Sequence, residues 1–171
     1  MKELLLIRHG KSDWNDPAPT DHDRPLNARG RRDAPRIAEA LAERKVSPGL
    51  VVASTAVRAA DTARRVAESL GFAPSGIVHL PELYLASPRT ILRVVQNLDE
   101  SASTALVFGH NPGMHEAANL FAGDAEIEEF PTLAVARIRL SSDHWGSADW
   151  GDGTLLELIL PRKLPDGPGG E

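Results

Sequence analysis

Cysteine is absent from this chain of 171 residues. Its absence excludes disulfide bonds, zinc sites built on thiolates and a cysteine nucleophile, and it fits a reducing compartment. Long apolar runs are missing as well. The first run, Leu4–Ile7, is too short for the core of a secretory signal peptide, and no stretch approaches the roughly 20 apolar residues that span a bilayer. We therefore expect a cytoplasmic protein without a membrane partner.

The sequence also lacks the overall positive charge that is typical of proteins that bind nucleic acid. Its net charge is −5 at pH 7, so we expect no nucleic-acid partner. Local positive charge is still available, because 15 of the 19 basic residues are arginines. The planar guanidinium group of arginine suits forked contacts to phosphate or carboxylate.

Short apolar segments alternate with amphipathic ones, without an internal repeat or a long linker. We expect strands at residues 4–7, 49–54, 76–80, 104–109, 132–140 and 154–160. We expect helices at residues 27–46, 57–70, 87–98 and 112–123. In the first helix Asn27 is the expected N-cap, and Pro35 should either kink the helix or delay its start.

Four strands that are each followed by a helix favour an α/β fold. The pattern predicts a three-layer α/β/α sandwich, with a mostly parallel central sheet and helices on both faces. We expect residues 1–161 to form a single domain and residues 162–171 to be a disordered tail. In such a sheet, ligands bind beyond the carboxyl ends of the strands.

Each of the four expected parallel strands ends beside a polar or ionisable residue. The residues concerned are Arg8 and His9 after the first strand, Ser54 and Arg58 after the second, Glu82 after the third and His110 after the fourth. Taken singly, each of them is more common as a structural or solvated residue. Their occurrence together at four matching strand ends predicts one site at this edge of the sheet.

Two histidines and two arginines in one site suit phosphoryl transfer through a histidine. A neutral imidazole is a good nucleophile, and its reference pKa of about 6.5 leaves it largely neutral at cellular pH. Guanidinium groups bind the charged oxygens of the transferred group, and Gly10 allows the backbone to approach it closely. We expect neither a metal nor another cofactor, because the arginines supply the positive charge.

Three segments resemble, in order, the motifs of the histidine phosphatase superfamily, which includes cofactor-dependent phosphoglycerate mutases and many phosphatases. These segments are LLLIRHGKSDWN (residues 4–15), ASTAVRAADTA (residues 53–63) and VFGHNPG (residues 107–113). They lie in the order of the family and span about two-thirds of the chain, so their joint occurrence is specific.

The resemblance assigns roles to individual residues. It implies that His9 becomes phosphorylated. The set that it places around the phosphoryl group consists of Arg8, Ser12, Asn15, Arg58 and His110, to which the close approach of the backbone at Gly10 adds a further expected contact. In larger members of the superfamily a glutamate after the third strand donates a proton to the leaving group, and Glu82 lies at about that place. Its alternative interpretation is an exposed loop carboxylate.

A further segment, DHDRPLNARG (residues 21–30), resembles the small phosphohistidine phosphatase branch, which removes phosphate from histidine on signalling proteins. The mutases carry long insertions that close a sugar-phosphate pocket, and the interval between Leu80 and Thr104 has no room for them. We therefore expect an open site that admits a bulky or protein-borne phosphoryl group.

Three functions remain open. The first is a phosphatase that acts on phosphohistidine proteins through a phosphohistidine intermediate on His9. The second is a phosphatase of a small phosphorylated metabolite, either a phosphoester or a nucleotide. The third is a non-catalytic phosphate-binding domain, although such a domain has no physical need for a nucleophile among its cations.

Overall fold

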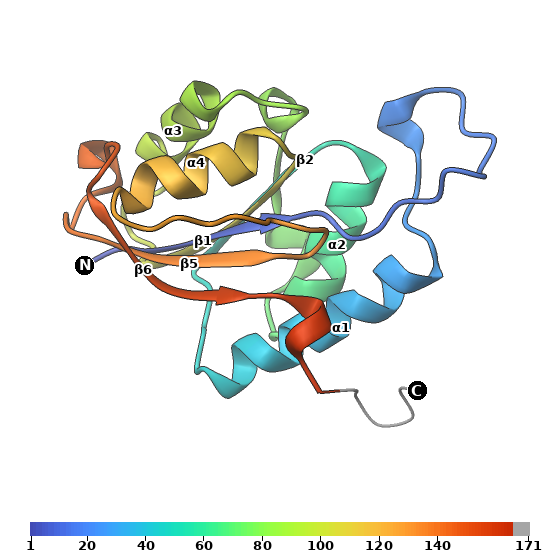
Figure 1. Ribbon diagram of the computed structural model, residues 1–171, viewed down its shortest axis with the longest axis horizontal. Helices are drawn as coiled ribbons and strands as arrows, with labels where there is room; N and C mark the ends of the chain where they lie inside the picture. Colours follow the sequence, from blue (N-terminus) through green and yellow to red (C-terminus); the bar gives the residue numbers. More distant parts are fainter. Residues whose placement is uncertain (166–171) are drawn as a thin grey trace.

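A sheet of six strands lies at the centre of the protein, in a computed structural model that describes residues 1–165 (Figure 1). The strands are β1 (Glu3–Arg8), β2 (Leu50–Ser54), β3 (Val78–Leu80), β4 (Thr104–Gly109), β5 (Val135–Leu140) and β6 (Gly153–Ile159). Their order across the sheet is β3-β2-β4-β1-β5-β6. The first four in this order are parallel, and β5 and β6 extend the sheet in antiparallel pairing. The expected mostly parallel sheet is therefore confirmed.

Two pairs of helices cover the sheet, one pair on each face (Figure 1). On one face α1 (Ala28–Glu43) packs against α2 (Val57–Ser69), and on the other α3 (Pro88–Gln96) packs against α4 (Gly113–Ala122). The expected α/β/α layering is confirmed. Within residues 1–165, no helix combines the length and the apolar character that crossing a membrane requires.

The strand β1 lies near the middle of the sheet and is covered on both faces. Leu4 and Leu6 belong to the apolar cluster with α3 and α4, whereas Leu5 and Ile7 belong to the cluster with α1 and α2. All four side chains are fully buried. Because successive side chains of a strand point to opposite faces, double coverage requires consecutive rather than alternating apolar residues. The chain becomes polar where β1 leaves this core, at Arg8.

The helix α1 begins where the sequence predicts, at its capping residue. The side chain of Asn27 accepts a hydrogen bond from the backbone N–H of Gly30 at 2.9 Å. Pro35 lies inside the helix, which still begins at Ala28, so the expected delay of the helix start is wrong. The cap and the buried inner face of the helix offset the hydrogen bond that a proline cannot donate.

The sequence predicts that the fifth strand begins at residue 132, but β5 begins at Val135. The preceding chain turns at Leu133, whose φ is 59°. The backbone N–H of Leu133 lies within hydrogen-bond distance of the carbonyl oxygens of Arg8 and His9, at 3.1 and 3.0 Å. This turn fixes the backbone just beyond the end of β1.

Residues 162–165 do not form the disordered tail that the sequence suggested. Arg36 on α1 donates from Nη2 to the carbonyl oxygens of Pro161 and Leu164, at 3.2 and 3.1 Å. The side chain of Leu164 packs against the apolar cluster of α1 and α2. Apolar burial and an arginine that binds carbonyl oxygens hold this segment. The remainder of the expected tail, residues 166–171, lies outside the described residues.

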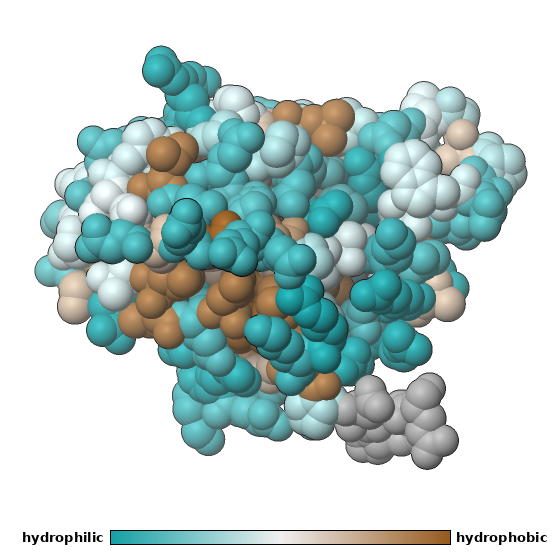
Figure 2. All heavy atoms as spheres, viewed as in Figure 1, coloured by the Kyte–Doolittle hydropathy of each residue, from teal (hydrophilic) through white to brown (hydrophobic). Residues whose placement is uncertain are grey.

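The surface over β5 and β6 carries most of the apolar colour in Figure 2, and hydrophilic residues surround it. Leu155 and Leu158 of β6 are half-buried and pack against the apolar cluster of α3 and α4. The carboxyl end of β1 points instead toward the loop that leads to α1, drawn in blue in Figure 1. The apolar area therefore lies apart from the edge at which the site is expected.

Candidate active site

A cavity of about 380 Å³ lies beyond the carboxyl ends of β1, β2 and β4. The residues that line it are Arg8, His9, Lys11, Ser12, Trp14, Asp21, Arg24, Arg58, Leu85, His110, Asn111 and Thr132. These three strands are neighbours in the sheet. The structure thus brings together five of the residues singled out from the sequence, which are Arg8, His9, Ser12, Arg58 and His110.

His9 presents one unprotonated ring nitrogen. Its Nδ1 lies 2.7 Å from the carbonyl oxygen of Gly10, and because a carbonyl can only accept, Nδ1 carries the hydrogen. In the neutral ring the lone pair is then on Nε2. Burial lowers the pKa of His9 to about 3, with further contributions from His110, Arg58 and Arg8. The ring is therefore a neutral, oriented nucleophile at neutral pH.

His110 follows β4 and is fully enclosed. Its Nε2 lies 2.8 Å from the hydroxyl oxygen of Ser54, which also accepts the backbone N–H of Ala56 at 3.2 Å. Burial lowers the pKa of His110 to about 3, and the nearby charges of Arg58 and Arg8 act in the same direction. Its Nδ1 has no hydrogen-bond partner among residues 1–165.

The two predicted arginines are held by different anchors. Arg58 donates from Nη1 to the carbonyl oxygen of Asp21 at 2.7 Å and from Nη2 to its carboxylate at 3.0 Å. Arg8 donates from Nη1 to the carbonyl oxygen of Phe130 at 3.3 Å, and its buried Nε has no partner among residues 1–165. Such unpaired N–H groups are suited to an anion.

The backbone around His9 is packed against the neighbouring helices. The N–H of Gly10 donates to the hydroxyl of Thr62 at 3.0 Å, and this hydroxyl donates to the carbonyl oxygen of Arg58 at 2.7 Å. Gly30 lies so close to Lys11 that a Cβ at residue 30 would come within 2.4 Å of its carbonyl oxygen. Gly10 does not line the cavity, but its carbonyl oxygen accepts the hydrogen bond from His9, which does.

Glu82 does not reach this cavity. It lies in the turn after β3, which is the edge strand of the sheet and is separated from β1 by β2 and β4. Its exposed side chain lines a second groove, together with residues of α3 such as Arg93 and Val94. Glu82 is therefore an exposed loop carboxylate, which agrees with the alternative interpretation of the sequence. The expectation that Glu82 lies beside the other site residues is wrong. The sequence pattern could not reveal that β3 is an outer strand.

Asn15 is also away from the cavity. It lies in the loop between β1 and α1, its side chain is exposed, and its backbone N–H donates to the carboxylate of Asp13 at 2.9 Å. Ser12 is buried and forms a bridge with Leu26, whereas Trp14 and Asn15 are exposed. Of these two residues, Trp14 lines the cavity and Asn15 does not.

Several residues of the site were missed in the sequence. Asp21 and Arg24 belong to the segment that resembles the small phosphatase branch, but neither was taken as a site residue. Tyr84 donates from its hydroxyl to Asp21 at 2.5 Å, and its ring meets that of His110 edge-on with centroids 5.3 Å apart. Asn111 directly follows His110 and donates to the carbonyl oxygen of Phe130 at 2.7 Å.

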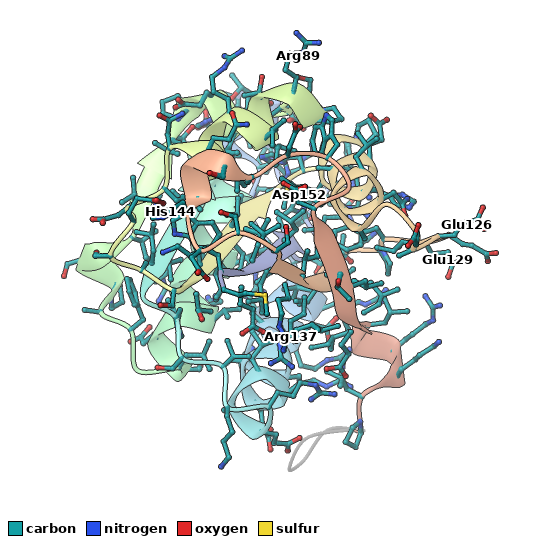
Figure 3. The ribbon with its side chains drawn as sticks, turned by 90° about the vertical axis from the view of Figure 1, so that its left-hand side faces the viewer. Arg89, Glu126, Glu129, Arg137, His144 and Asp152 are labelled. Atoms are coloured by element: carbon teal, nitrogen blue, oxygen red, sulfur yellow. The ribbon has the colours of Figure 1, made fainter. Side chains whose placement is uncertain are left out.

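The site is rich in donors and poor in carboxylates. Its lining includes three arginines and one lysine but a single carboxylate, that of Asp21. Other carboxylates lie outside the cavity: Glu126 and Glu129, in the loop between α4 and β5, extend away from the body of the protein (Figure 3). Residues 1–165 contain no group of three or more His, Asp or Glu that could hold a metal ion. The arrangement suits a multiply charged anion.

Comparisons with known proteins agree with this geometry. The model of the histidine phosphatase superfamily (branch 1) matches residues 4–84. An uncharacterized protein of Mycobacterium tuberculosis is 32% identical over 165 residues, which cover 91% of this chain and 100% of that protein. An uncharacterized chloroplastic protein of Arabidopsis thaliana is 31% identical over 155 residues, which cover 86% of this chain and 70% of that protein.

Solved structures resemble the whole fold. The protein histidine phosphatase SixA complexed with tungstate matches with a TM-score of 0.79 and 26% identity, over 94% of this chain and 97% of that one. A SixA protein of Agrobacterium tumefaciens also gives a TM-score of 0.79, with 28% identity over 94% of this chain and 98% of that one. The similarity therefore extends well beyond the three short motifs.

Proposed function

Because the chain belongs to the histidine phosphatase superfamily, we propose that it is a phosphatase in which His9 carries the phosphoryl group from substrate to water. The observation that supports this role is the orientation of His9. Its Nδ1–H is bound to a backbone carbonyl, so that Nε2 is free to attack. A domain that only binds phosphate would have no need of a buried, neutral nucleophile among cations.

In the first step Nε2 of His9 attacks the phosphorus atom. A bond forms between phosphorus and Nε2, the bond to the leaving group breaks, and the leaving group takes the electron pair. In this proposal Arg8, Arg58 and His110, which line the cavity, bind the other phosphoryl oxygens, which carry the negative charge throughout. These donors are already anchored by Phe130, Asp21 and Ser54, so little reorganisation is required.

In the second step water attacks the phosphohistidine. The bond between phosphorus and Nε2 breaks, and the electron pair returns to the ring, while the proton of the water passes to the released phosphate or to solvent. Because Nδ1 keeps its hydrogen throughout, His9 leaves as neutral imidazole and not as an anion. The enzyme returns to its starting state without a metal ion.

The chemistry of the cavity supports a phosphohistidine protein as the substrate. Asp21 is the one carboxylate that lines the cavity within residues 1–165, and its oxygens accept from Arg58 and Tyr84 and pair with Arg24. It presents no O–H group to a substrate. A leaving group that departs without a proton donor from the enzyme is therefore favoured. A phosphohistidine whose other ring nitrogen carries a proton meets this condition, because its ring leaves as neutral imidazole, far more easily than an alkoxide leaves.

A small phosphorylated metabolite is the alternative substrate. A cavity of about 380 Å³ lies within the range of small-molecule sites. Among such compounds the same argument favours aryl phosphates over alkyl phosphates, because the phenolate leaves more easily. The two candidates therefore differ in the size of the substrate and not in the requirement for a good leaving group.

The test compares kcat/KM for a phosphohistidine peptide, an aryl phosphate and an alkyl phosphate. General acids contribute about a hundredfold to ten-thousandfold where they are needed, so we expect the alkyl phosphate to be at least about a hundredfold poorer than the other two. Preference for the peptide over free phosphohistidine would support a protein substrate. Equal turnover of alkyl phosphate and phosphohistidine would contradict the proposal.

A further inference from the structure

Arg24 is a buried cation whose hydrogen-bonding capacity is only partly used. It lies in the loop between β1 and α1, lines the cavity and is 7% exposed. Its Nη2 pairs with the carboxylate of Asp21. Its Nε and Nη1 are buried and have no hydrogen-bond partner among residues 1–165. A buried guanidinium group with two unpaired donors is costly unless a ligand completes it.

Trp14 covers the flat face of this guanidinium group. The central carbon of Arg24 lies 3.3 Å from the centroid of the indole ring. Trp14 also lines the cavity, although the residue is 73% exposed, the largest exposed fraction among the large apolar residues described. A face-on contact leaves the N–H groups in the plane of the guanidinium group available. The stack therefore orients Arg24 without consuming its donors.

The cavity carries a net positive charge, which suits a phosphoryl group. Lys11 and the arginines Arg8, Arg24 and Arg58 supply four positive charges, and Asp21 removes one, while both site histidines are neutral. A phosphoryl group attached through one atom carries about −1.5 to −2 at pH 7. Among these four cations, Arg24 is the one with two buried nitrogen atoms that lack a hydrogen-bond partner within residues 1–165.

We propose that Arg24 is a further phosphoryl-binding residue, which donates from Nε and Nη1, and that Trp14 is a positioning residue that fixes the plane of its guanidinium group. This inference rests on the proposed function, because it concerns the same cavity. If Arg24 served only to hold the carboxylate of Asp21 in place, the contact from Nη2 would be enough. Burial of Nε and Nη1 beside the cavity would then cost free energy without a compensating hydrogen bond.

The test measures the affinity of the intact protein for inorganic phosphate by calorimetry, which requires no turnover. Charge-assisted hydrogen bonds are strong, so Arg24→Met should raise the Kd by at least about tenfold. The control is Arg44→Met, which breaks a partly buried two-point ion pair with Glu157, at 2.7 and 2.8 Å, outside the cavity. This control should leave the Kd within about twofold of the unaltered protein. An equal Kd for all three proteins would overturn the proposal.

A double-mutant cycle with Asp21→Asn separates binding from bracing. If Arg24 contacts phosphate, Arg24→Met raises the Kd by a similar factor in the Asp21→Asn background. If it acts only through Asp21, the second substitution adds nothing, and that result would overturn direct binding. A protein that binds phosphate as expected but hydrolyses none of the substrates above would contradict the proposed function and leave this inference intact.

The role of Trp14 is tested with Phe and Ala. Because Phe retains an aromatic face, Trp14→Phe should keep the Kd within about twofold, whereas Trp14→Ala should raise it by about threefold or more. The indole of Trp14 should also change its fluorescence when phosphate binds, and Trp14→Phe should lose this change although Trp145 and Trp150 remain. Unaltered affinity in Trp14→Ala would overturn the positioning role.

Discussion

The imidazole rings of His9 and His110 lie with their centroids 5.1 Å apart and their planes tilted by 55°. Both rings are buried beside the guanidinium groups of Arg8 and Arg58. A proton on either buried ring would place a further cation beside two permanent ones. Burial is the main cause of the low pKa values of the two rings, and the charges of Arg58 and Arg8 add to it.

The first prediction concerns stability at acidic pH. Between about pH 3 and 6.5 the unfolded chain binds protons on His9 and His110 that the native protein does not. The free energy of unfolding is thus unaffected by these rings above pH 6.5 and falls as the pH drops through this window. At pH 5 each ring should lower the free energy of unfolding by roughly 2 kcal/mol.

Urea unfolding at pH 7.5 and pH 5.0 measures this effect. The free energy of unfolding should fall less between the two pH values in His9→Gln than in the unaltered protein. The difference should equal the contribution of one ring, roughly 2 kcal/mol. His144→Gln is the control, because His144 is exposed and extends from the surface (Figure 3). An unchanged pH dependence in His9→Gln would show that burial of this ring does not oppose its protonation.

The second prediction concerns the covalent intermediate. His9→Ala removes the attacking nitrogen, and kcat/KM should fall by at least about a thousandfold. Quenching the unaltered enzyme in base during turnover of a labelled substrate should trap an acid-labile phosphoryl group that His9→Ala lacks. His79→Ala, at an exposed histidine of β3, should retain both activity and label. An acid-stable label on serine would assign the nucleophile elsewhere.

The third prediction concerns Glu82. Its carboxylate faces the groove beside α3 and not the cavity, so Glu82→Gln should change kcat/KM by less than about twofold on every substrate. The measurement uses substrates whose leaving groups span a wide range of pKa. A loss of kcat/KM that grows as the leaving group becomes poorer is the signature of a proton donor. Such a result would show that Glu82 acts as the general acid.

The fourth prediction concerns metal ions. In the proposed mechanism the positive charge that binds the phosphoryl group comes from the basic side chains that line the cavity. We expect full activity after treatment with a strong chelator. A matched sample with added Mg²⁺ should show the same kcat/KM. Loss of activity on chelation, followed by recovery with a divalent ion, would contradict a mechanism that relies on arginine alone.

The fifth prediction concerns the close approach of Gly30 to the loop of His9. A Cβ at this position would lie 2.4 Å from the carbonyl oxygen of Lys11, so Gly30→Ala must displace the backbone. We expect a loss of about 1–3 kcal/mol in the free energy of unfolding, and a lower kcat because His9 moves with its neighbours. In Gly146→Ala the nearest atom would lie at 3.8 Å, and this control should leave kcat unchanged.

Sequence patterns predicted the layers of the fold because each apolar run or amphipathic stretch marks its own element. They also predicted that Arg8, His9, Arg58 and His110 meet in one cavity, since each of these lies at the end of a strand or shortly after it. The patterns do not contain the order of the strands, which depends on pairing between distant segments. For that reason Glu82 was expected near the site, although β3 lies at the edge of the sheet.

Loop residues were the harder part of the site. Trp14 and Arg24 lie in a segment without periodicity, and their stacking depends on how the loop folds back after Ser12. Tyr84 follows Glu82 by two residues, and only the conformation of the turn decides which of the two side chains reaches His110. Such choices are made by tertiary contacts, which leave no regular spacing in a sequence.

The acceptor that orients His9 is the main-chain oxygen of residue 10 and not a side chain. Every amino acid supplies this oxygen, so no replacement of a partner side chain can abolish the bond. In many enzymes a carboxylate orients the histidine, and a single base change in the gene can remove that carboxylate. Here the tautomer of His9 is fixed by the peptide backbone. Natural variants in which the proton moves from Nδ1 to Nε2 should therefore arise only where a substitution shifts the surrounding chain.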